Sequence, residues 1–150
     1  MNKLYTMVGI PGSGKSTIAN QIPNAVVISS DAIRKELYGA EEIQGNGKQV
    51  FDLVYKRIGE ELAKGNDVVF DATNLTPWAR KAVFRFPAER IAVFVNTPLD
   101  VCLERNAARA RKVPEEVIYR MYDNLIYPSK TEGFKTIITV TTWQSLVNNI

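Results

Sequence analysis

The sequence predicts a three-layer α/β domain, in which helices cover both faces of a mostly parallel five-stranded sheet. Short apolar runs alternate with amphipathic stretches along all 150 residues, a pattern typical of such sheets. A glycine-rich loop follows the first apolar run and precedes a segment that can begin a helix. The length, with 45% hydrophobic and 23% charged residues, fits one domain with its own core, so residues 1–150 are predicted to form a single domain.

Five strands are expected, with helices between them. Their predicted ranges are 4–8, 25–29, 67–71, 90–96 and 135–140. Helices are expected over 49–64, from Pro77, over 99–109, from Pro114, and over 142–149. The aromatic residues Trp78, Phe84 and Phe86 are expected to pack in the core or against helices. In open parallel sheets ligands bind beyond the carboxyl ends of the strands, so the functional groups are expected there.

Several classes of protein are excluded by what the chain lacks. It has no histidine, which rules out Ser-His catalysis and His-ligated zinc, so a general base must be a carboxylate or, less readily, Lys or Tyr. The single Cys102 permits no internal disulfide and is expected to be a small buried hydrophobe. No apolar run approaches the ~20 residues of a membrane span and no signal-peptide pattern is found, so the chain is predicted to be cytoplasmic with no membrane partner.

The glycine-rich loop is the strongest motif. Residues 9–17 read G-I-P-G-S-G-K-S-T and fill every fixed position of G-x-x-x-x-G-K-[ST], the phosphate-binding P-loop. Glycines let successive backbone N–H groups turn toward one anion, and the following helix N-terminus adds partial positive charge. Lys15 is expected to reach the β- and γ-phosphates and Ser16 to ligate Mg²⁺. The residues predicted to bind ATP here are Gly12, Ser13, Gly14, Lys15, Ser16 and Thr17.

A carboxylate and a guanidinium follow the second strand. Asp31 would stand at the carboxyl end of that strand, and Arg34, three residues later, would share its helix face. In phosphoryl transfer such a carboxylate can accept the proton of the attacking hydroxyl, and such an Arg can hold a phosphate. From spacing alone an alternative stays open, in which Asp31 or Ser30 only caps the helix.

A second acid ends the third strand. The run Val68-Val69-Phe70-Asp71 has the Walker B form, in which the acid holds Mg²⁺ directly or through water, so Asp71 joins Ser16 as a predicted metal residue. Many strands also end in Asp for turn chemistry alone, and that alternative remains.

A cluster of cations predicts a lid over the P-loop at about residues 105–113. Arg105, Arg109, Arg111 and Lys112 fall within eight residues, and Arg105 and Arg109, four apart, are expected on one helix face. Such a segment can close on a triphosphate and neutralise charge in the transition state. The alternative is a solvated basic helix end.

Taken in order, these motifs resemble the 5′ polynucleotide kinase family, the kinase domain of phage and eukaryotic end-healing enzymes. The resemblance covers about residues 1–140 and rests on the P-loop, Asp31-x-x-Arg34, Phe70-Asp71-Ala72-Thr73-Asn74, Arg105-Asn-x-x-Arg109 leading into Val113-Pro114, Val117-Ile118-x-Arg120-Met121, and Pro128-x-x-x-Glu132-Gly133-Phe134. It implies that Asp31 activates a 5′-hydroxyl, that Arg34 engages an acceptor phosphate, and that Arg109 contacts the phosphates of ATP. Ala72 stands where phage relatives often carry an acid, which leaves metal and substrate roles open for Asp71.

The sequence therefore predicts a kinase-type P-loop NTPase that transfers the γ-phosphate of ATP to the 5′-hydroxyl of DNA or RNA. Asp31, Lys15, Arg34 and Arg109 are the predicted catalytic residues, Arg105 and Arg109 are predicted to help bind ATP, and Mg²⁺ is the expected cofactor. The net charge of +3 is compatible with an anionic substrate. Two alternatives remain: a small-molecule or nucleoside-type kinase with the same Asp–Arg and lid logic, and a nucleotide-binding ATPase or regulator that transfers nothing to a hydroxyl.

Overall fold

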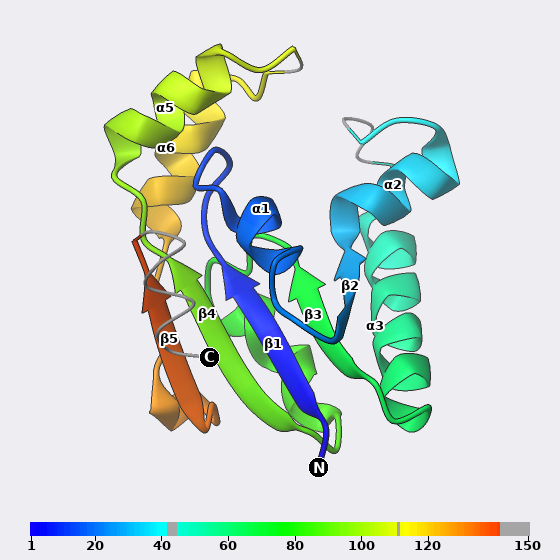
Figure 1. The fold of residues 1–150 in the computed structure, drawn as a ribbon. Coiled ribbons are helices and arrows are strands. Elements are labelled where there is room, and N and C mark those ends of the chain that lie inside the picture. The colour runs from blue at the N-terminus through cyan, green and yellow to red at the C-terminus, as the bar shows by residue number, and fades with distance from the viewer. Residues whose placement is uncertain (42–44, 111, 142–150) are drawn as a thin grey trace.

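A five-stranded sheet forms the centre of the molecule (Figure 1). The computed structural model describes residues 1–41, 45–110 and 112–141. The strands run β2-β3-β1-β4-β5 across the sheet, and each neighbouring pair among them is parallel. The predicted sheet is confirmed, and each predicted strand end lies within one residue of the observed one: β1 (Lys3–Val8), β2 (Ala25–Ser29), β3 (Asp67–Asp71), β4 (Glu89–Val95) and β5 (Thr136–Val140).

Helices and short 3-10 turns connect the strands. In the described part of the chain they are α1 (Lys15–Ala19), α2 (Ser30–Tyr38), α3 (Gly47–Ala63), α4 (Pro77–Arg80), α5 (Leu99–Ala107) and α6 (Glu115–Asn124), with 3-10 turns η1 (Lys81–Arg85) and η2 (Lys130–Glu132). The helix expected over 142–149 lies outside the described residues. Among the helices that the structure describes, none is long and apolar enough to cross a membrane.

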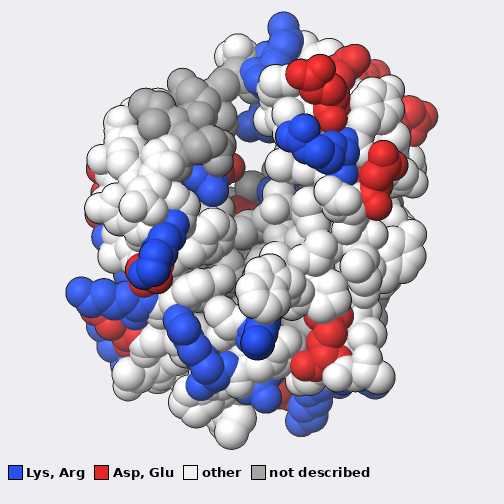
Figure 2. Space-filling view, turned by 180° about the vertical axis from the view of Figure 1, so that it is seen from behind, with Lys and Arg blue, Asp and Glu red and all other residues white. Residues whose placement is uncertain are grey.

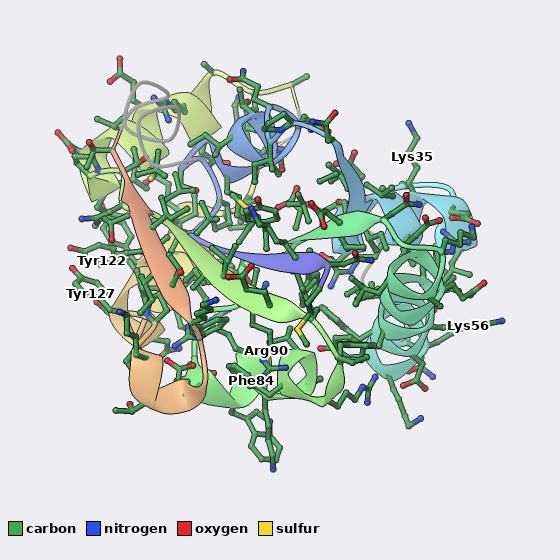
Figure 3. The ribbon with its side chains drawn as sticks, turned by 60° about the horizontal axis from the view of Figure 1, so that its bottom comes forward. Lys35, Lys56, Phe84, Arg90, Tyr122 and Tyr127 are labelled. Carbon is green, nitrogen blue, oxygen red and sulfur yellow. The ribbon has the colours of Figure 1, made fainter. Side chains whose placement is uncertain are left out.

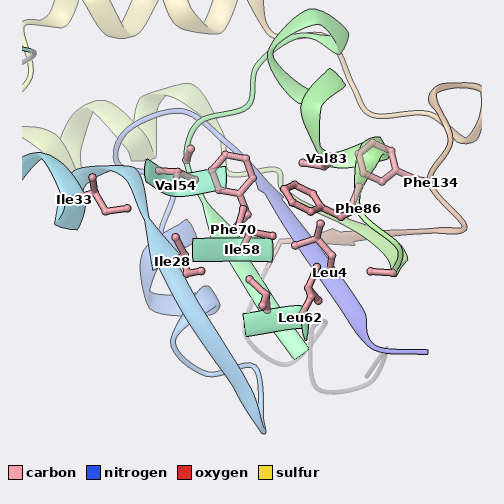
Figure 4. Packing of buried hydrophobic residues seen from close by; sticks show 14 of the residues in the cluster. Leu4, Ile28, Ile33, Val54, Ile58, Leu62, Phe70, Val83, Phe86 and Phe134 are labelled. Carbon is pink, nitrogen blue, oxygen red and sulfur yellow. The ribbon is translucent and has the colours of Figure 1, made fainter. Parts of the chain in front are cut away.

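The two faces of the sheet bury different helices because successive side chains of a strand point to opposite faces. Leu4 of β1 packs with α3 and η1 behind the sheet, whereas Tyr5 and Met7 pack with α1 on the front (Figure 1). The larger, rear cluster contains one face of α3 and the Phe70 side chain, both seen in Figure 4. The three-layer arrangement predicted from the alternating pattern is therefore confirmed.

A third apolar cluster fastens α5 and α6 to the P-loop side of the sheet. Ile10 of the loop, Cys102 of α5 and Ile118 of α6 are buried together. Burial raises the pKa of the Cys102 thiol above its ordinary value, and this keeps the side chain a neutral apolar filler, as the sequence predicted. The base of the predicted lid thus stands on a packed support.

The expectation for the aromatic residues after β3 is met in part. Phe86 is buried in the rear cluster, and Phe84 packs edge-on against Phe134 with 4.9 Å between ring centroids. The expectation for Trp78 is wrong, because its side chain is 79% exposed on the outer side of α4. A helix of four residues is too short for its sequence pattern to show which side faces water. The inner side is occupied by Arg80, which is fully buried.

Candidate active site

The P-loop has the backbone conformation that its glycines allow. Gly12 and Gly14 have φ angles of 84° and 91°, in the left-handed region that side chains with a Cβ rarely adopt. A Cβ on Gly12 would also collide with the backbone carbonyl of Cys102 in α5. The loop is therefore tightly turned against α5, and α1 begins at Lys15 directly after it.

Side chains from outside the loop bind its carbonyl groups. The hydroxyl of Thr97 donates to the carbonyl of Ser13 at 2.7 Å. Arg105 Nη1 donates to the same carbonyl at 3.1 Å and to that of Gly12 at 3.4 Å. These bonds from the α5 side fix the loop, so that the start of α1 faces the cavity. The first N–H groups of a helix have no intrahelical acceptor and are therefore available to a ligand. That set of donors suits a phosphate chain.

Ser16 and Asp71, the two predicted metal residues, are in direct contact. The Ser16 hydroxyl donates to Asp71 Oδ2 at 2.7 Å. Asp71 is 4% exposed, and its Oδ1 is buried with no hydrogen-bond partner among the residues that the structure describes. A buried carboxylate oxygen without a donor, next to a hydroxyl at the end of a P-loop, is the set of oxygen donors that Mg²⁺ prefers. The residues present therefore fit the ion.

The loop after β3 is hydrogen-bonded to the start of the P-loop. Gly9 donates its N–H to the carbonyl of Thr73 at 3.1 Å, and the Asn74 amide donates to the carbonyl of Met7 at 2.9 Å. Asn74 has a φ of 48°, and it is 5% exposed. These contacts hold Asp71 in register with the P-loop, so the Asp71-Ala72-Thr73-Asn74 run has a structural function that its sequence pattern did not reveal.

A buried ion pair anchors this loop from behind. Arg80 donates from Nε and Nη2 to the two oxygens of Glu132 at 2.8 and 2.9 Å, and from Nη1 to the carbonyl of Asn74 at 2.7 Å. Arg80 is 0% exposed, and Glu132 also accepts the N–H of Ser129. Sequence reasoning quoted Glu132 only as part of the family motif and missed Arg80. The sequence signal that was available is a basic residue, Arg80, in the segment between two strands, but this signal does not identify Glu132 as its partner.

Asp31 and Arg34 form an ion pair on α2. Arg34 Nη1 lies 2.9 Å from Asp31 Oδ1, and the side chains are 14% and 53% exposed respectively. The helix cap is Ser29, whose hydroxyl accepts the N–H of Ala32 at 3.2 Å. The alternative in which Asp31 or Ser30 serves only as the cap is therefore wrong. Arg34 also lies over the ring of Phe51 from α3, 5.8 Å from its centroid, which fixes the guanidinium beside the carboxylate.

The predicted lid begins where α5 ends. The helix stops at Ala107, two residues earlier than expected, so Arg105 and Arg109 do not share a helix face. Asn106, 2% exposed, explains the stop: its side chain donates to the carbonyl of Val113 at 2.7 Å and accepts the Val113 N–H at 2.9 Å. Asn106 thus closes the base of the segment, while Arg109 is exposed at its start. Residue 111 lies outside the described part of the chain.

These elements surround one cavity of about 760 Å³ beyond the carboxyl ends of the strands. Figure 2, seen from behind, shows the hollow near the top of the molecule. Phe51, Val117, Arg120 and Met121 line it in addition to every site residue predicted from sequence: Gly12, Ser13, Gly14, Lys15, Ser16, Thr17, Asp31, Arg34, Asp71, Arg105 and Arg109. The volume is in the range of sites that hold small molecules and cofactors.

Comparisons with known proteins agree with this fold. The chain is 27% identical over 143 residues to an L-seryl-tRNA(Sec) kinase of Methanococcus maripaludis, covering 83% of this chain and 53% of the relative. A chain in an RNA repair complex, Pnkp1/Rnl/Hen1, superposes with a TM-score of 0.73 at 21% identity, covering 83% of this chain and 44% of that one. A sugar kinase from Janibacter sp. HTCC2649 superposes at 0.75 with 15% identity, covering 99% and 92%. The chain spans about half the length of the first two.

A family model described as an AAA domain matches residues 4–128. That stretch contains the P-loop, the Asp31–Arg34 pair, Asp71 and the lid, and thus every side of the cavity. With its P-loop kinase-like fold and a match over most of its length, the chain belongs to the AAA domain family.

Proposed function

We propose that this chain is an ATP-dependent kinase that phosphorylates the 5′-hydroxyl of a nucleic acid, RNA or DNA. The observation that carries the proposal is the position of Asp31 and Arg34, which stand on α2 and line the same cavity as the P-loop (Figure 1). A hydroxyl placed between them and the γ-phosphate meets a proton acceptor, a phosphate-binding cation and the donor at once.

In the proposed reaction Asp31 accepts the proton of the attacking hydroxyl. The hydroxyl oxygen forms a bond to the γ-phosphorus, the bond from that phosphorus to the β–γ bridging oxygen breaks, and ADP leaves. Lys15 from the P-loop and Arg109 from the lid both line the cavity, and in this proposal they bind the phosphoryl oxygens as charge develops. Arg34 orients the acceptor through one of its phosphates.

Magnesium would be held by Ser16 and Asp71, whose oxygen atoms meet beside the P-loop. Bound there, the ion would neutralise charge on the β- and γ-phosphates. Arg105 has a different function in this proposal from the one predicted from sequence. Its guanidinium holds the carbonyls of Gly12 and Ser13, so it shapes the loop that binds the phosphates.

The nucleic-acid acceptor is supported by two of the similar proteins. One relative is named as a kinase of a charged tRNA, and one similar chain belongs to an RNA repair complex. A second candidate function, phosphorylation of a small sugar-like hydroxyl compound, is favoured by the sugar kinase that superposes over nearly its whole length. Affinity for a nucleic acid falls as salt rises, whereas affinity for a neutral sugar does not, so salt separates the two.

The test is transfer of labelled γ-phosphate from ATP to a panel of acceptors. The panel contains 5′-hydroxyl RNA and DNA oligonucleotides, the same strands with a 5′-phosphate, serine-charged tRNA and small sugars, with the Lys15→Ala variant as background. Label on the 5′-hydroxyl strands alone is the expected result. Label confined to tRNA or to sugars would overturn the 5′-hydroxyl proposal, and ATP turnover without any labelled acceptor would favour an ATPase.

A further inference from the structure

The outer side of α4 and η1 carries a tryptophan that packs against little of its own protein. Trp78 is 79% exposed, although tryptophan side chains in proteins are highly buried on average. Lys81, one turn later, holds its ammonium 5.0 Å from the centre of the indole ring. One face of the indole is therefore beside a cation, and most of its surface is open to solvent.

This tryptophan stands on a firmly held support. Arg80, its second neighbour, makes three hydrogen bonds to Glu132 and to the carbonyl of Asn74 in the interior. The Thr76 hydroxyl accepts the N–H of Ala79 at 3.1 Å and caps the helix. A four-residue helix has little stability of its own, so these contacts are what hold the backbone that carries the exposed indole.

The charges around Trp78 favour a polyanion. No acidic residue occurs between Asp71 and Glu89, whereas Lys81 and Arg85 are both exposed. Arg85 lies over the rings of Tyr55 and Phe86, 4.8 and 5.2 Å from their centroids, and is thereby held in place at the surface. Glu132, the acid that contacts this segment, has both oxygens engaged by Arg80. We call Trp78, Lys81 and Arg85 the α4 surface.

The α4 surface is linked to the cavity by a short stretch of chain. Thr73 lines the cavity, and Trp78 follows five residues later, so their Cα atoms are at most about 18 Å apart. Because α4 and η1 lie behind the sheet in Figure 1, they belong to the face that Figure 2 presents, where Lys and Arg side chains, together with some acidic ones, lie below the hollow. A strand whose end is in the cavity can therefore reach Trp78 within a few nucleotides.

We infer that the α4 surface binds the acceptor strand on the 3′ side of the reacting end, an inference that rests on the proposed function. One base stacks on the Trp78 indole, and neighbouring phosphates contact Lys81 and Arg85. Aromatic rings combined with cations bind single-stranded nucleic acid in this way without reading its sequence. A protein partner fits less well, because charged residues are depleted at the centre of protein interfaces, and here they flank a single ring.

The kinetic test compares a decamer with a dinucleotide, both single-stranded with a 5′-hydroxyl. Trp78→Ala should raise the KM for the decamer by about 5- to 150-fold, the range expected from loss of one stacked base, and should change kcat little. The KM for the dinucleotide, too short to reach the α4 surface, should change less than twofold. Trp78→Phe keeps an aromatic ring, so its KM for the decamer should stay much closer to the wild-type value than that of Trp78→Ala. A variant that merely failed to fold would not show this difference.

The matched controls are another exposed aromatic residue and another exposed lysine. Tyr122 is 46% exposed on α6, and Lys56 projects from α3. Figure 3 shows them at opposite edges of the molecule, both away from Phe84 of η1. Tyr122→Ala and Lys56→Ala should leave the decamer KM unchanged, whereas Lys81→Ala should lower the slope of log KM against log salt by about 0.7. Equal effects of Lys56→Ala and Lys81→Ala would overturn the inference.

A binding test is independent of catalysis. Trp78 and Trp143 are the two tryptophans of the chain, so Trp143→Phe leaves Trp78 as the reporter. Adding the decamer without ATP should quench the Trp78 fluorescence of this variant, and the 5′-phosphorylated decamer should quench it as well. Quenching in an enzyme that phosphorylates no oligonucleotide would support the α4 surface and overturn the proposed function. Phosphorylation of the decamer with neither quenching nor a Trp78→Ala effect would overturn the α4 surface alone.

Discussion

The donor and acceptor sides of the cavity are built in different ways. On the donor side Asp71, the Ser16 hydroxyl and the P-loop carbonyls are held by buried or half-buried hydrogen bonds. Asp31 on the acceptor side is half exposed, and the lid residue Arg109 is open to solvent. We therefore expect the P-loop and its metal residues to be preorganised, and we expect Asp31 and Arg109 to gain contacts when substrate binds. Preorganised dipoles bind charge without reorganising at the moment of reaction, which suits the triphosphate side.

The largest effect is expected where the donor side is anchored. Arg80→Met leaves the carboxylate of Glu132 buried without its cation, and breaking a buried pair in this way costs about 3–5 kcal/mol. The free energy of unfolding, measured by urea denaturation, should fall by that amount. Lys81→Met, an exposed neighbour, is the control and should change it little. A loss for Arg80→Met as small as that of the control would show that the donor side does not depend on this clamp.

The lid arginine should matter next. Arg109→Ala should lower turnover by about 10²–10³, because the contact strengthens as charge develops on the transferred group. Single-turnover transfer rates measure this directly, and Lys35→Ala, an exposed cation that projects from α2 (Figure 3), is the matched control. An effect limited to the KM of the acceptor would place Arg109 in acceptor binding, and the lid would then have no part in the chemical step.

The next prediction tests whether Asp71 binds magnesium on the donor side. Asp71→Asn should raise the magnesium concentration needed for half-maximal activity by about 10- to 100-fold. Asp67→Asn, at the other end of β3, where the carboxylate accepts the N–H of Lys3, is the control and should not change it. An unchanged magnesium requirement with a raised acceptor KM would assign Asp71 to the acceptor instead.

The smallest effect concerns the exposed link between α2 and α3. Hydrogen bonds from Arg57 lower the pKa of Glu36 below its ordinary value of 4.5. Because the folded-state pKa is depressed, the pair stabilises the fold above pH 4.5 and loses its effect as pH falls through the lowered value. Glu36→Gln should therefore lower the free energy of unfolding slightly at neutral pH and hardly at all in strong acid, as measured by urea denaturation at both pH values. A difference in the free energy of unfolding from wild type that stays constant across this pH range would contradict this pH dependence.

Local sequence patterns were enough to predict the sheet and many of the residues that line the cavity. Strand positions follow from apolar runs, and the P-loop, Asp31 and Asp71 follow strands whose carboxyl ends meet at one edge. Contacts between distant segments could not be predicted, because nothing in the sequence around Arg80 names Glu132, 52 residues away. The early end of α5 depends likewise on Asn106 reaching Val113, and the exposure of Trp78 depends on which side of α4 the buried Arg80 takes.

Different residues of the cavity bind the donor and accept the proton, and Asp31 is the proposed base. The most direct test measures ATP affinity and single-turnover transfer of labelled γ-phosphate to a 5′-hydroxyl oligonucleotide in wild type and in Asp31→Asn, with the 5′-phosphorylated strand as control. We expect Asp31→Asn to bind ATP with an affinity within twofold of wild type and to transfer phosphate at a rate lower by about 10²–10⁴. Transfer at the wild-type rate in Asp31→Asn would show that Asp31 is not the base.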